Sequence, residues 1–223
     1  MSFIRFILRA LRILQRETLN LYWRIQKGKF AGTKAIFTLD SDGLDRQGFP
    51  NEIAVYSCPI ICPTGQAHLF ENKLHNIRLA VSKMQGLLIQ PGEIFSFWKL
   101  TGPPEKKNGF KEGATFIDRQ VSSAIGGGLC QLSGLLHNLA LLAGCSVLER
   151  HAHSIDAYGE DRYIPLGQDA TVTYPRIDLC FQNPHPFSLL LKINIAQNRA
   201  EAWFYAPQSL PYQVKIEISK PTF

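Results

Sequence analysis

Hydrophobic residues recur along this chain with two different periods, which predict where helices and strands lie. In residues 1–29, large apolar side chains recur at helical spacing and gather on one side of a helix. They are Phe3, Ile4, Ile7, Leu11, Leu14, Leu21, Tyr22 and Ile25. The arginines of this segment fall on the opposite side, at Arg5, Arg9, Arg12 and Arg16. The pattern predicts a basic amphipathic helical arm.

Two further helices and a set of strands are predicted downstream. Apolar residues at helical spacing predict a helix over 69–85, and a continuous apolar run predicts a buried helix over 129–143. Short apolar segments between glycine and proline turns predict strands at 35–39, 53–56, 87–89, 94–98, 114–117, 146–151, 170–173, 177–181, 187–195, 200–205 and 214–218. These elements predict an α+β fold, in which a mostly antiparallel sheet packs on a buried central helix behind an N-terminal amphipathic helix.

The spacing of glycine and proline divides the chain into four predicted parts. Residues 1–29 form the helical arm, and residues 30–68 form a linker with short strands. Residues 69–205 form the core domain, and residues 206–223 form a C-terminal strand or tail. Residues 197–199 are predicted to be the turn of a terminal hairpin.

The charge of the chain is concentrated in the arm. Residues 1–29 hold seven basic residues and one acidic residue, so the whole net charge of +6 lies there and the rest is balanced. A generally basic nucleic-acid-binding domain is therefore disfavoured. Two interpretations of the arm remain: a helix docked on the domain with its arginines in water, or a helix lying in an anionic membrane surface with Tyr22 and Trp23 among the headgroups.

The cysteines and the apolar runs bear on the compartment. An odd number of cysteines, at Cys58, Cys62, Cys130, Cys145 and Cys180, favours reduced thiols over a disulfide framework. No run approaches the roughly 18 apolar residues of a transmembrane helix, and no signal-peptide cleavage site is evident. We expect a cytoplasmic protein, bound peripherally on the inner face of the cytoplasmic membrane. The pattern leaves its oligomeric state open.

The candidate chemistry begins with the stretch Gly-Gly-Gly-Leu-Cys-Gln, which places Cys130 in the first turn of the predicted buried helix. Backbone N–H groups and the helix dipole at this end can lower the pKa of a thiol and make it nucleophilic. Gly126, Gly127 and Gly128 permit the backbone conformations of an anion-binding nest or an oxyanion hole, with the N–H of Gln131 as a further donor.

Two histidines follow about twenty residues later and are candidate general bases. His151 and His153 would share one face of a strand, so both could face the cysteine. Asp156, Asp169 or Asp178 could orient the imidazole, and we assign that role to Asp156.

Other interpretations of this cluster stay open. Cys130 could be a small buried thiol that packs a glycine-rich turn, or it could join His151 and His153 in a zinc site with an open position. The glycines could also bind a phosphate without covalent chemistry, although the lysine of a nucleotide-binding loop is absent. Our assignment includes no metal and no cofactor.

Several motifs together resemble the VanW family of vancomycin B-type resistance accessory proteins. They are Pro-Gly-Glu-Ile-Phe-Ser-Phe-Trp at 91–98, Gly-Gly-Gly-Leu-Cys-Gln-Leu-Ser at 126–133, Glu-Arg-His-Ala-His-Ser at 149–154, Asp-Ala-Thr-Val at 169–172 and Phe-Gln-Asn-Pro at 181–184. Residues 118–120 depart from the resemblance, since members often carry a glycine turn there. The resemblance implies a link to glycopeptide resistance but no established activity.

The residues and the resemblance lead to two functional hypotheses. The first is a cysteine-dependent hydrolase or transferase that acts on an amide or ester bond of a cell-envelope precursor, with Cys130 as nucleophile and His151 or His153 as base. The second is a non-enzymatic binding module, which uses the glycine-lined cleft to hold a peptide or an anionic ligand.

Overall fold

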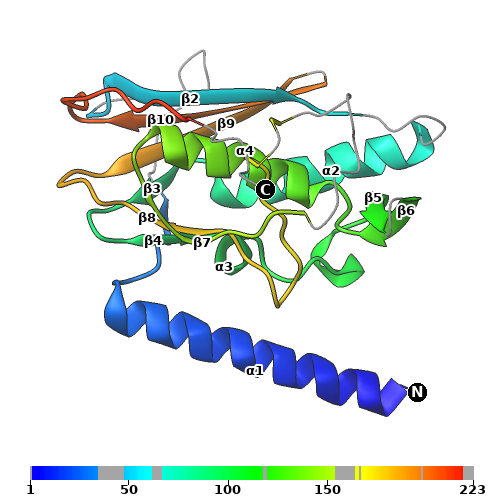
Figure 1. Ribbon diagram of the computed structural model, residues 1–223. Coiled ribbons are helices and arrows are strands. Elements are labelled where there is room, and N and C mark those ends of the chain that lie inside the picture. Colours follow the sequence, from blue (N-terminus) through cyan, green and yellow to red (C-terminus); the bar gives the residue numbers. More distant parts are fainter. Residues whose placement is uncertain are drawn as a thin grey trace, which may run out of the picture.

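The computed structural model describes residues 2–34, 48–61, 67–117, 120–153, 164–165, 167–196 and 198–217. The described chain is layered (Figure 1). A five-stranded sheet forms one side, helices α2 and α4 lie against it, a three-stranded sheet follows, and helix α1 lies beyond that sheet. The predicted α+β fold with an N-terminal helix is confirmed. The strand predicted over 35–39 lies outside the described residues.

The larger sheet is antiparallel and has the strand order β1-β3-β9-β10-β2. Its strands are β1 (Thr33–Lys34), β2 (Asn51–Pro59), β3 (Leu87–Ile89), β9 (Leu189–Ala196) and β10 (Arg199–Ala206). Strands β9 and β10 form the predicted terminal hairpin, in which Ala196 pairs with Arg199. On β10, alternate residues Ala200, Ala202 and Phe204 are buried, as the two-residue period of a strand requires for a face that covers a core.

The smaller sheet has the order β4-β8-β7 and is also antiparallel. Its strands are β4 (Ile94–Ser96), β7 (Ser146–Glu149) and β8 (Cys180–Gln182), and a separate hairpin pairs β5 (Glu112–Ile117) with β6 (Gln120–Ile125). Phe95 and Phe181 are cross-strand partners whose rings stack with their centroids 4.4 Å apart. Aromatic pairs of this kind stabilise neighbouring strands.

Several predicted strands differ from the structure, and residues 214–217 of the strand predicted over 214–218 form no strand. The segment predicted over 94–98 leaves the sheet after Ser96, because the Ser96 hydroxyl accepts a hydrogen bond from the Lys99 N–H at 3.2 Å and caps helix α3 (Phe97–Thr101). Residues 170–173 form no strand; Thr173 makes only an isolated bridge to Ile177. A single turn of 3-10 helix, η1 (Lys106–Asn108), lies before β5.

The central helix α4 (Leu129–Leu142) is buried between the two sheets, as predicted. It contacts β2 and β10 on one side, β7 on the other, and helix α2 (Ala67–Met84) beside it. A helix that is apolar all round must be covered on every side. The side chains that fill these contacts are Leu132, Leu135, Leu136 and Leu139, each at most 1% exposed.

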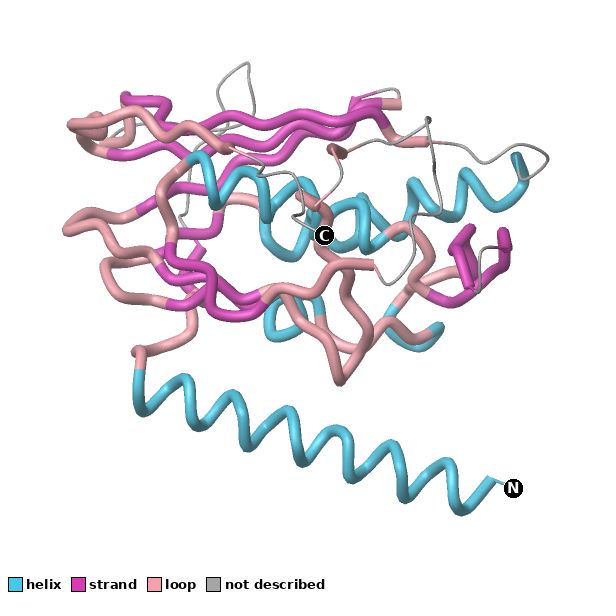
Figure 2. The backbone as a smooth tube through the Cα atoms, in the orientation of Figure 1, coloured by secondary structure: helices cyan, strands magenta, loops and turns pink. Residues whose placement is uncertain are grey.

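Helix α1 (Ser2–Gln26) docks on the domain through its basic face. Figure 2 shows that it faces loops and α3 rather than the flat face of a sheet. Arg16 is only 6% exposed, whereas Ile4 and Ile25 are 65% and 71% exposed. The docking is therefore the reverse of that expected for an amphipathic helix that buries its apolar face.

Candidate functional site

Cys130 is the second residue of α4 and lies in its first turn, as predicted. Gly128 caps this end of the helix in the left-handed conformation, with φ of 101°. Cys130 as a whole residue is partly exposed, and its Sγ lies 3.4 Å from Oγ1 of Thr171 and 3.5 Å from the carbonyl oxygen of Val172. The sulfur therefore sits between the positive end of a helix and the segment that follows residue 168.

His153 and Asp169 form a hydrogen-bonded pair near this thiol. The His153 side chain is close enough to Cys130 to lower the pKa of its thiol, and its Nδ1 lies 2.7 Å from Oδ2 of Asp169. The same carboxylate oxygen accepts the backbone N–H of His153 at 2.6 Å, and its other oxygen lies 3.2 Å from Nη2 of Arg150. Because Nδ1 is engaged with Asp169, Nε2 is the ring nitrogen available to the cysteine.

The protonation states of the three groups are coupled. Burial acts to raise the pKa of the Cys130 thiol, but the hydrogen bond and charge of His153, with a hydrogen bond to the Thr171 hydroxyl, outweigh it and lower the pKa below its ordinary value. Hydrogen bonds to Asp169 and Cys130 raise the pKa of His153 to about 9. Burial opposes ionisation of Asp169, yet His153 and Arg150 hold its pKa below the ordinary value. These directions favour a thiolate–imidazolium pair at neutral pH.

The other described cysteines have the opposite character. Burial raises the pKa of Cys58 and of Cys145 to about 12. Burial and the nearby carboxylates of Asp178 and Glu149 raise the pKa of Cys180 well above its ordinary value. Among the described cysteines, the thiol pKa is lowered at Cys130 alone.

The other predicted base, His151, makes different contacts, and the predicted orienting residue falls outside the described part of the chain. Strand β7 ends at Glu149, so the alternation that would put both histidines on one face does not extend to them. The His151 side chain is 49% exposed with Nε2 3.5 Å from Oε1 of Glu149, while its carbonyl accepts the N–H of Thr171 at 2.8 Å. Asp156 lies outside the described residues. The orienting contact comes from Asp169, one of the three aspartates considered.

The glycine run lies against protein rather than lining an open cleft. A side chain at Gly127 would collide with the backbone of Gly113, and one at Gly128 would collide with the side chain of Lys73. Gly126 and Gly128 also have positive φ values of 84° and 101°, which L side chains rarely adopt. The three glycines allow close packing around the start of α4, a different role from the ligand-binding one expected of them.

Gln131 also has a role other than the predicted one. Its backbone N–H donates to the carbonyl of Gly128 at 3.0 Å, so it is not free to act as an oxyanion donor. Its side-chain amide donates to the carbonyl of Pro59, which ties α4 to β2. In the described part of the chain, the N–H of Cys130 donates to no backbone carbonyl, which makes it the donor best placed for an oxyanion beside the sulfur.

Sequence reasoning missed Thr171 and Arg150. Thr171 contacts the sulfur, and Arg150 holds the segment that carries Asp169 through bonds of 2.7 Å to the carbonyls of Gly167 and Asp169. The available signal was the Asp-Ala-Thr-Val motif at 169–172, because both of its polar side chains reach the site.

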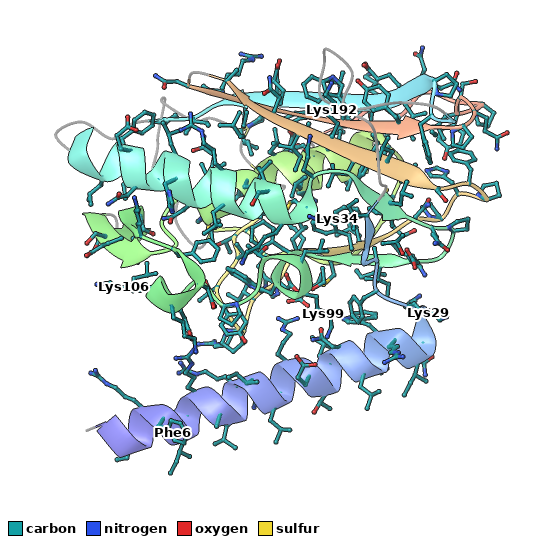
Figure 3. The ribbon with its side chains drawn as sticks, turned by 180° about the vertical axis from the view of Figure 1, so that it is seen from behind. Phe6, Lys29, Lys34, Lys99, Lys106 and Lys192 are labelled. Atoms are coloured by element: carbon teal, nitrogen blue, oxygen red, sulfur yellow. The ribbon has the colours of Figure 1, made fainter. Side chains whose placement is uncertain are left out.

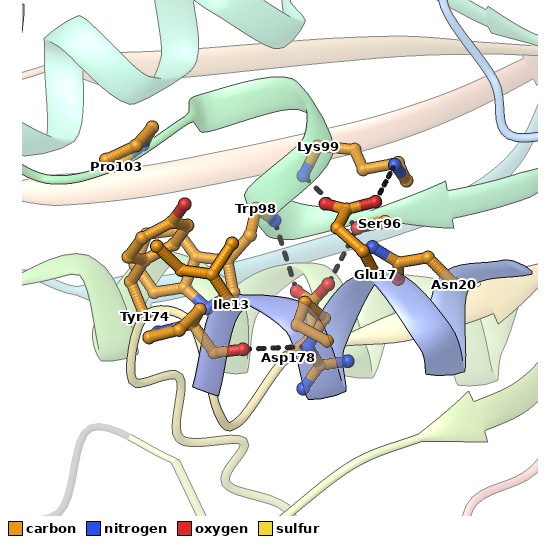
Figure 4. Close-up of a pocket in the computed structure, with 11 residues that line it drawn as sticks. Ile13, Glu17, Asn20, Ser96, Trp98, Lys99, Pro103, Tyr174 and Asp178 are labelled. Carbon is orange, nitrogen blue, oxygen red and sulfur yellow. Dashed lines mark hydrogen bonds and ion pairs between the residues drawn. The ribbon is translucent and has the colours of Figure 1, made fainter. Parts of the chain in front are cut away.

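A cavity of about 280 Å³ lies elsewhere, between α1 and the domain (Figure 4). Asp178 lines it and accepts hydrogen bonds from the Ser96 hydroxyl at 2.7 Å and the Trp98 N–H at 3.1 Å. Cys130 and His153 are not among its lining residues. Asp178, the third aspartate considered, therefore belongs to the seam between α1 and the domain.

His137, on α4, has a protonation state unlike that of His153. Burial lowers the pKa of His137 to about 4, so this histidine is neutral inside α4. Within the described ranges, no group of three or more histidine, cysteine or acidic side chains is gathered closely enough to hold a metal ion. None of the described helices has the apolar run that a membrane span requires.

Comparison with known proteins places this geometry in context. The family model described as "VanW like protein" matches residues 72–205. The chain is 37% identical over 114 residues to "Vancomycin B-type resistance protein VanW" of Enterococcus faecalis, which is 51% of this chain and 42% of that protein. It is 30% identical over 122 residues to "Uncharacterized protein YoaR" of Bacillus subtilis, which is 55% of this chain and 39% of that protein. The match thus spans less than half of either relative, and no solved structure matches.

Proposed function

The chain belongs to the VanW-like family, and from that premise we propose that it is a thiol hydrolase or acyltransferase with Cys130 as its nucleophile. The observation that carries the proposal is the contact chain from Cys130 through His153 to Asp169, at the start of a buried helix. A nucleophile held by a base, which is itself oriented by a third group, is the arrangement of cysteine and serine acyl-transfer enzymes.

Each residue would have a separate role in the reaction. The Cys130 thiolate attacks the carbonyl carbon of an amide or ester, and the displaced electron pair forms an oxyanion that the N–H of Cys130 stabilises. The His153 imidazolium then gives its Nε2 proton to the leaving amine or alcohol, which leaves a thioester on Cys130. Water or an acceptor amine, deprotonated by neutral His153, attacks the thioester and restores the thiolate.

Asp169 and Arg150 would act through the histidine. The bond of 2.7 Å from Asp169 to Nδ1 fixes the tautomer and the orientation of the ring, and the second bond to the backbone N–H of His153 fixes the position of the residue. Arg150 in turn holds Asp169. The imidazole is therefore oriented before substrate arrives, which lowers the cost of reaching the reactive geometry.

The proposed substrate class is an acyl compound of the cell envelope. It is supported by the name of the Enterococcus faecalis relative, a vancomycin resistance protein, and the family match over residues 72–205 includes the residues that form the site. The rival hypothesis of a glycine-lined binding cleft has less support, since Gly113 and Lys73 fill the space beside the glycines.

Covalent trapping tests this proposal. Full-length protein is incubated with peptide vinyl sulfones and, separately, with cell-wall precursor peptides, then quenched in acid and mapped by mass spectrometry. We expect an adduct or thioester on Cys130 that Cys130→Ala abolishes and Cys145→Ala, a buried-thiol control, retains. An unmodified Cys130 throughout the panel, or equal labelling of the Cys130→Ala protein, would contradict the proposal.

A further inference from the structure

Helix α1 presents a continuous apolar surface to solvent along its length. Eight large side chains on its side away from the domain are between 41% and 71% exposed: Ile4, Ile7, Leu8, Leu11, Leu14, Leu21, Tyr22 and Ile25. We call these residues the outward face of α1. At 1.5 Å per residue the 25-residue helix is about 37 Å long. Figure 3 shows side chains projecting from this helix away from the domain. An apolar strip of this length is unusual on a soluble surface and marks an interaction site.

The contacts on the opposite side of α1 hold the outward face in this orientation. The Arg16 guanidinium binds both oxygens of Glu149, at 2.6 and 2.8 Å, and donates through Nε to the carbonyl of Pro175 at 2.8 Å. Arg9 pairs with Glu105 near the start of the helix. A bidentate guanidinium–carboxylate pair is directional, so it fixes the rotation of the helix about its axis. The polar side of α1 is thereby engaged, and the apolar side is left outward.

Basic residues flank the outward face and indicate what kind of partner binds it. At about 100° per residue, Arg5 and Arg12 fall along one edge of the apolar strip and Arg24 along the other. All three are exposed, and in the described part of the chain none of them makes an ion pair. The segment 1–29 carries the entire net charge of +6. An apolar strip between cationic edges complements a lipid surface with anionic headgroups.

We propose that the outward face of α1 inserts into the headgroup region of an anionic lipid membrane, with the domain held above it by Arg16 and Arg9. Tyr22, near the C-terminal end of the helix and 53% exposed, has the amphipathic ring that suits this depth. A second copy of the chain would fit the strip less well, because pairing two such faces would bring the cationic edges of both copies together. The inference does not depend on the chemistry of Cys130.

Vesicle binding by the full-length protein tests the proposal. Sedimentation is measured with vesicles of phosphatidylcholine alone and with vesicles that contain 30% phosphatidylglycerol, at low and at high salt. We expect binding to the anionic vesicles that weakens as salt is added. Leu11→Gln and Leu14→Gln together should reduce this binding at least tenfold, because they remove apolar area from the middle of the strip.

A matched pair of charge reversals shows whether vesicle binding depends on the position of a basic residue or only on the net charge of the protein. Arg12→Glu lies on the edge of the outward face, and Lys192→Glu makes the same change in charge on β9, in the sheet on the other side of the molecule (Figure 3). A basic residue near an anionic surface contributes enough for a roughly fivefold change in binding. We therefore expect Arg12→Glu to weaken binding fivefold or more and Lys192→Glu to leave it nearly unchanged.

Three outcomes would overturn the proposal, provided that circular dichroism shows each variant to be folded. They are no binding to anionic vesicles at low salt, equal binding to both kinds of vesicle, and equal weakening by Arg12→Glu and Lys192→Glu. A dimer that forms without vesicles and that the two leucine substitutions disrupt would assign the strip to a second copy instead.

Discussion

Two cysteines of this protein belong to groups of interacting side chains that include an aspartate, yet the pKa values of their thiols shift in opposite directions. Cys130 contacts His153, and Asp169 lies on the far side of the imidazole. The thiol of Cys180 instead donates directly to Oδ2 of Asp178 at 3.5 Å. The pKa of Cys130 is lowered, whereas burial and Asp178 raise that of Cys180 well above its ordinary value.

The difference shows that the order of the groups, more than their presence, makes a thiol reactive. An imidazolium between sulfur and carboxylate stabilises a thiolate on one side and is stabilised by the carboxylate on the other. A carboxylate in direct contact with the sulfur repels the thiolate and favours S–H as a donor. Cys180 is also fully buried, while Cys130 is partly accessible. One region is therefore suited to chemistry, and the other to holding α1 and the smaller sheet together.

The largest difference between the two regions is expected when Asp169 and Asp178 are each replaced by asparagine. In Asp169→Asn the amide can stabilise the wrong tautomer of His153, so we expect the rate of acyl transfer to fall on the order of 10³-fold, with little change in stability. Asp178→Asn should leave the rate unchanged but cost about 2 kcal/mol in the free energy of unfolding, since Asp178 accepts from Ser96, Trp98 and Cys180 in the core.

Steady-state rates and urea unfolding of both variants check this pair. Trapping rates of Cys130 by a peptide vinyl sulfone can replace turnover before a substrate is known. A loss of rate in Asp178→Asn as large as that in Asp169→Asn would remove the distinction between the two regions.

Removing Arg16 should weaken only the structural region. The side chains of Arg16 and Glu149 are 5% and 9% exposed, and Arg16→Met would leave a buried carboxylate without its partner. We expect a loss of about 3 kcal/mol in the free energy of unfolding at neutral pH, measured with urea. Adding Glu149→Gln should restore part of it, because the unpaired charge is then gone. The alkylation rate of Cys130 in the folded protein should stay within twofold of the wild-type rate.

Replacing Thr171 should have a smaller effect, which is confined to the reactivity of Cys130. Its hydroxyl lies 3.4 Å from the Cys130 sulfur and helps to lower the thiol pKa. In Thr171→Val this hydrogen bond is lost with little change in volume, so we expect alkylation of Cys130 at pH 7 to slow about fivefold. Cys180 should remain unlabelled in the folded protein. Unchanged alkylation would mean that His153 alone sets the state of the thiol.

The sequence predicted the half of the site that is local in the chain. The glycine run followed by apolar residues located Cys130 in the first turn of α4, and the order of cysteine and histidine brought His153 into consideration. The assignment of the orienting role to Asp156 rested on order in the chain alone, and order does not show where the segment after residue 163 returns to the helix and brings Asp169 to His153. Arg150 fixes this return by binding the carbonyls of Gly167 and Asp169, and such contacts have no periodic signature.

The sequence also could not show which face of α1 packs against the domain. The apolar and basic faces were visible in the pattern of residues, but which face meets the domain depends on Glu149 and on the carbonyls of Pro175 and Arg176. These acceptors lie more than 130 residues away in the chain. Amphipathicity alone predicts burial of the apolar face, and the buried carboxylate reverses that preference. By contrast, the cap that ends β4 has a local signal that the prediction of a strand over 94–98 overlooked, since Ser96 is a preferred N-cap residue.

The pH dependence of Cys130 alkylation tests the central claim most directly. The rate constant for iodoacetamide, read from the Cys130 peptide by mass spectrometry between pH 4 and 10, follows the thiolate fraction. Because the pKa of Cys130 is lowered by His153, the midpoint should lie below that of an ordinary thiol, and His153→Ala should move it above that value, since burial then dominates. His151→Ala should leave the midpoint in place. Acyl transfer should decline above about pH 9, where His153 loses its proton. A wild-type midpoint at or above the ordinary value, or one that His153→Ala does not raise, would contradict the account.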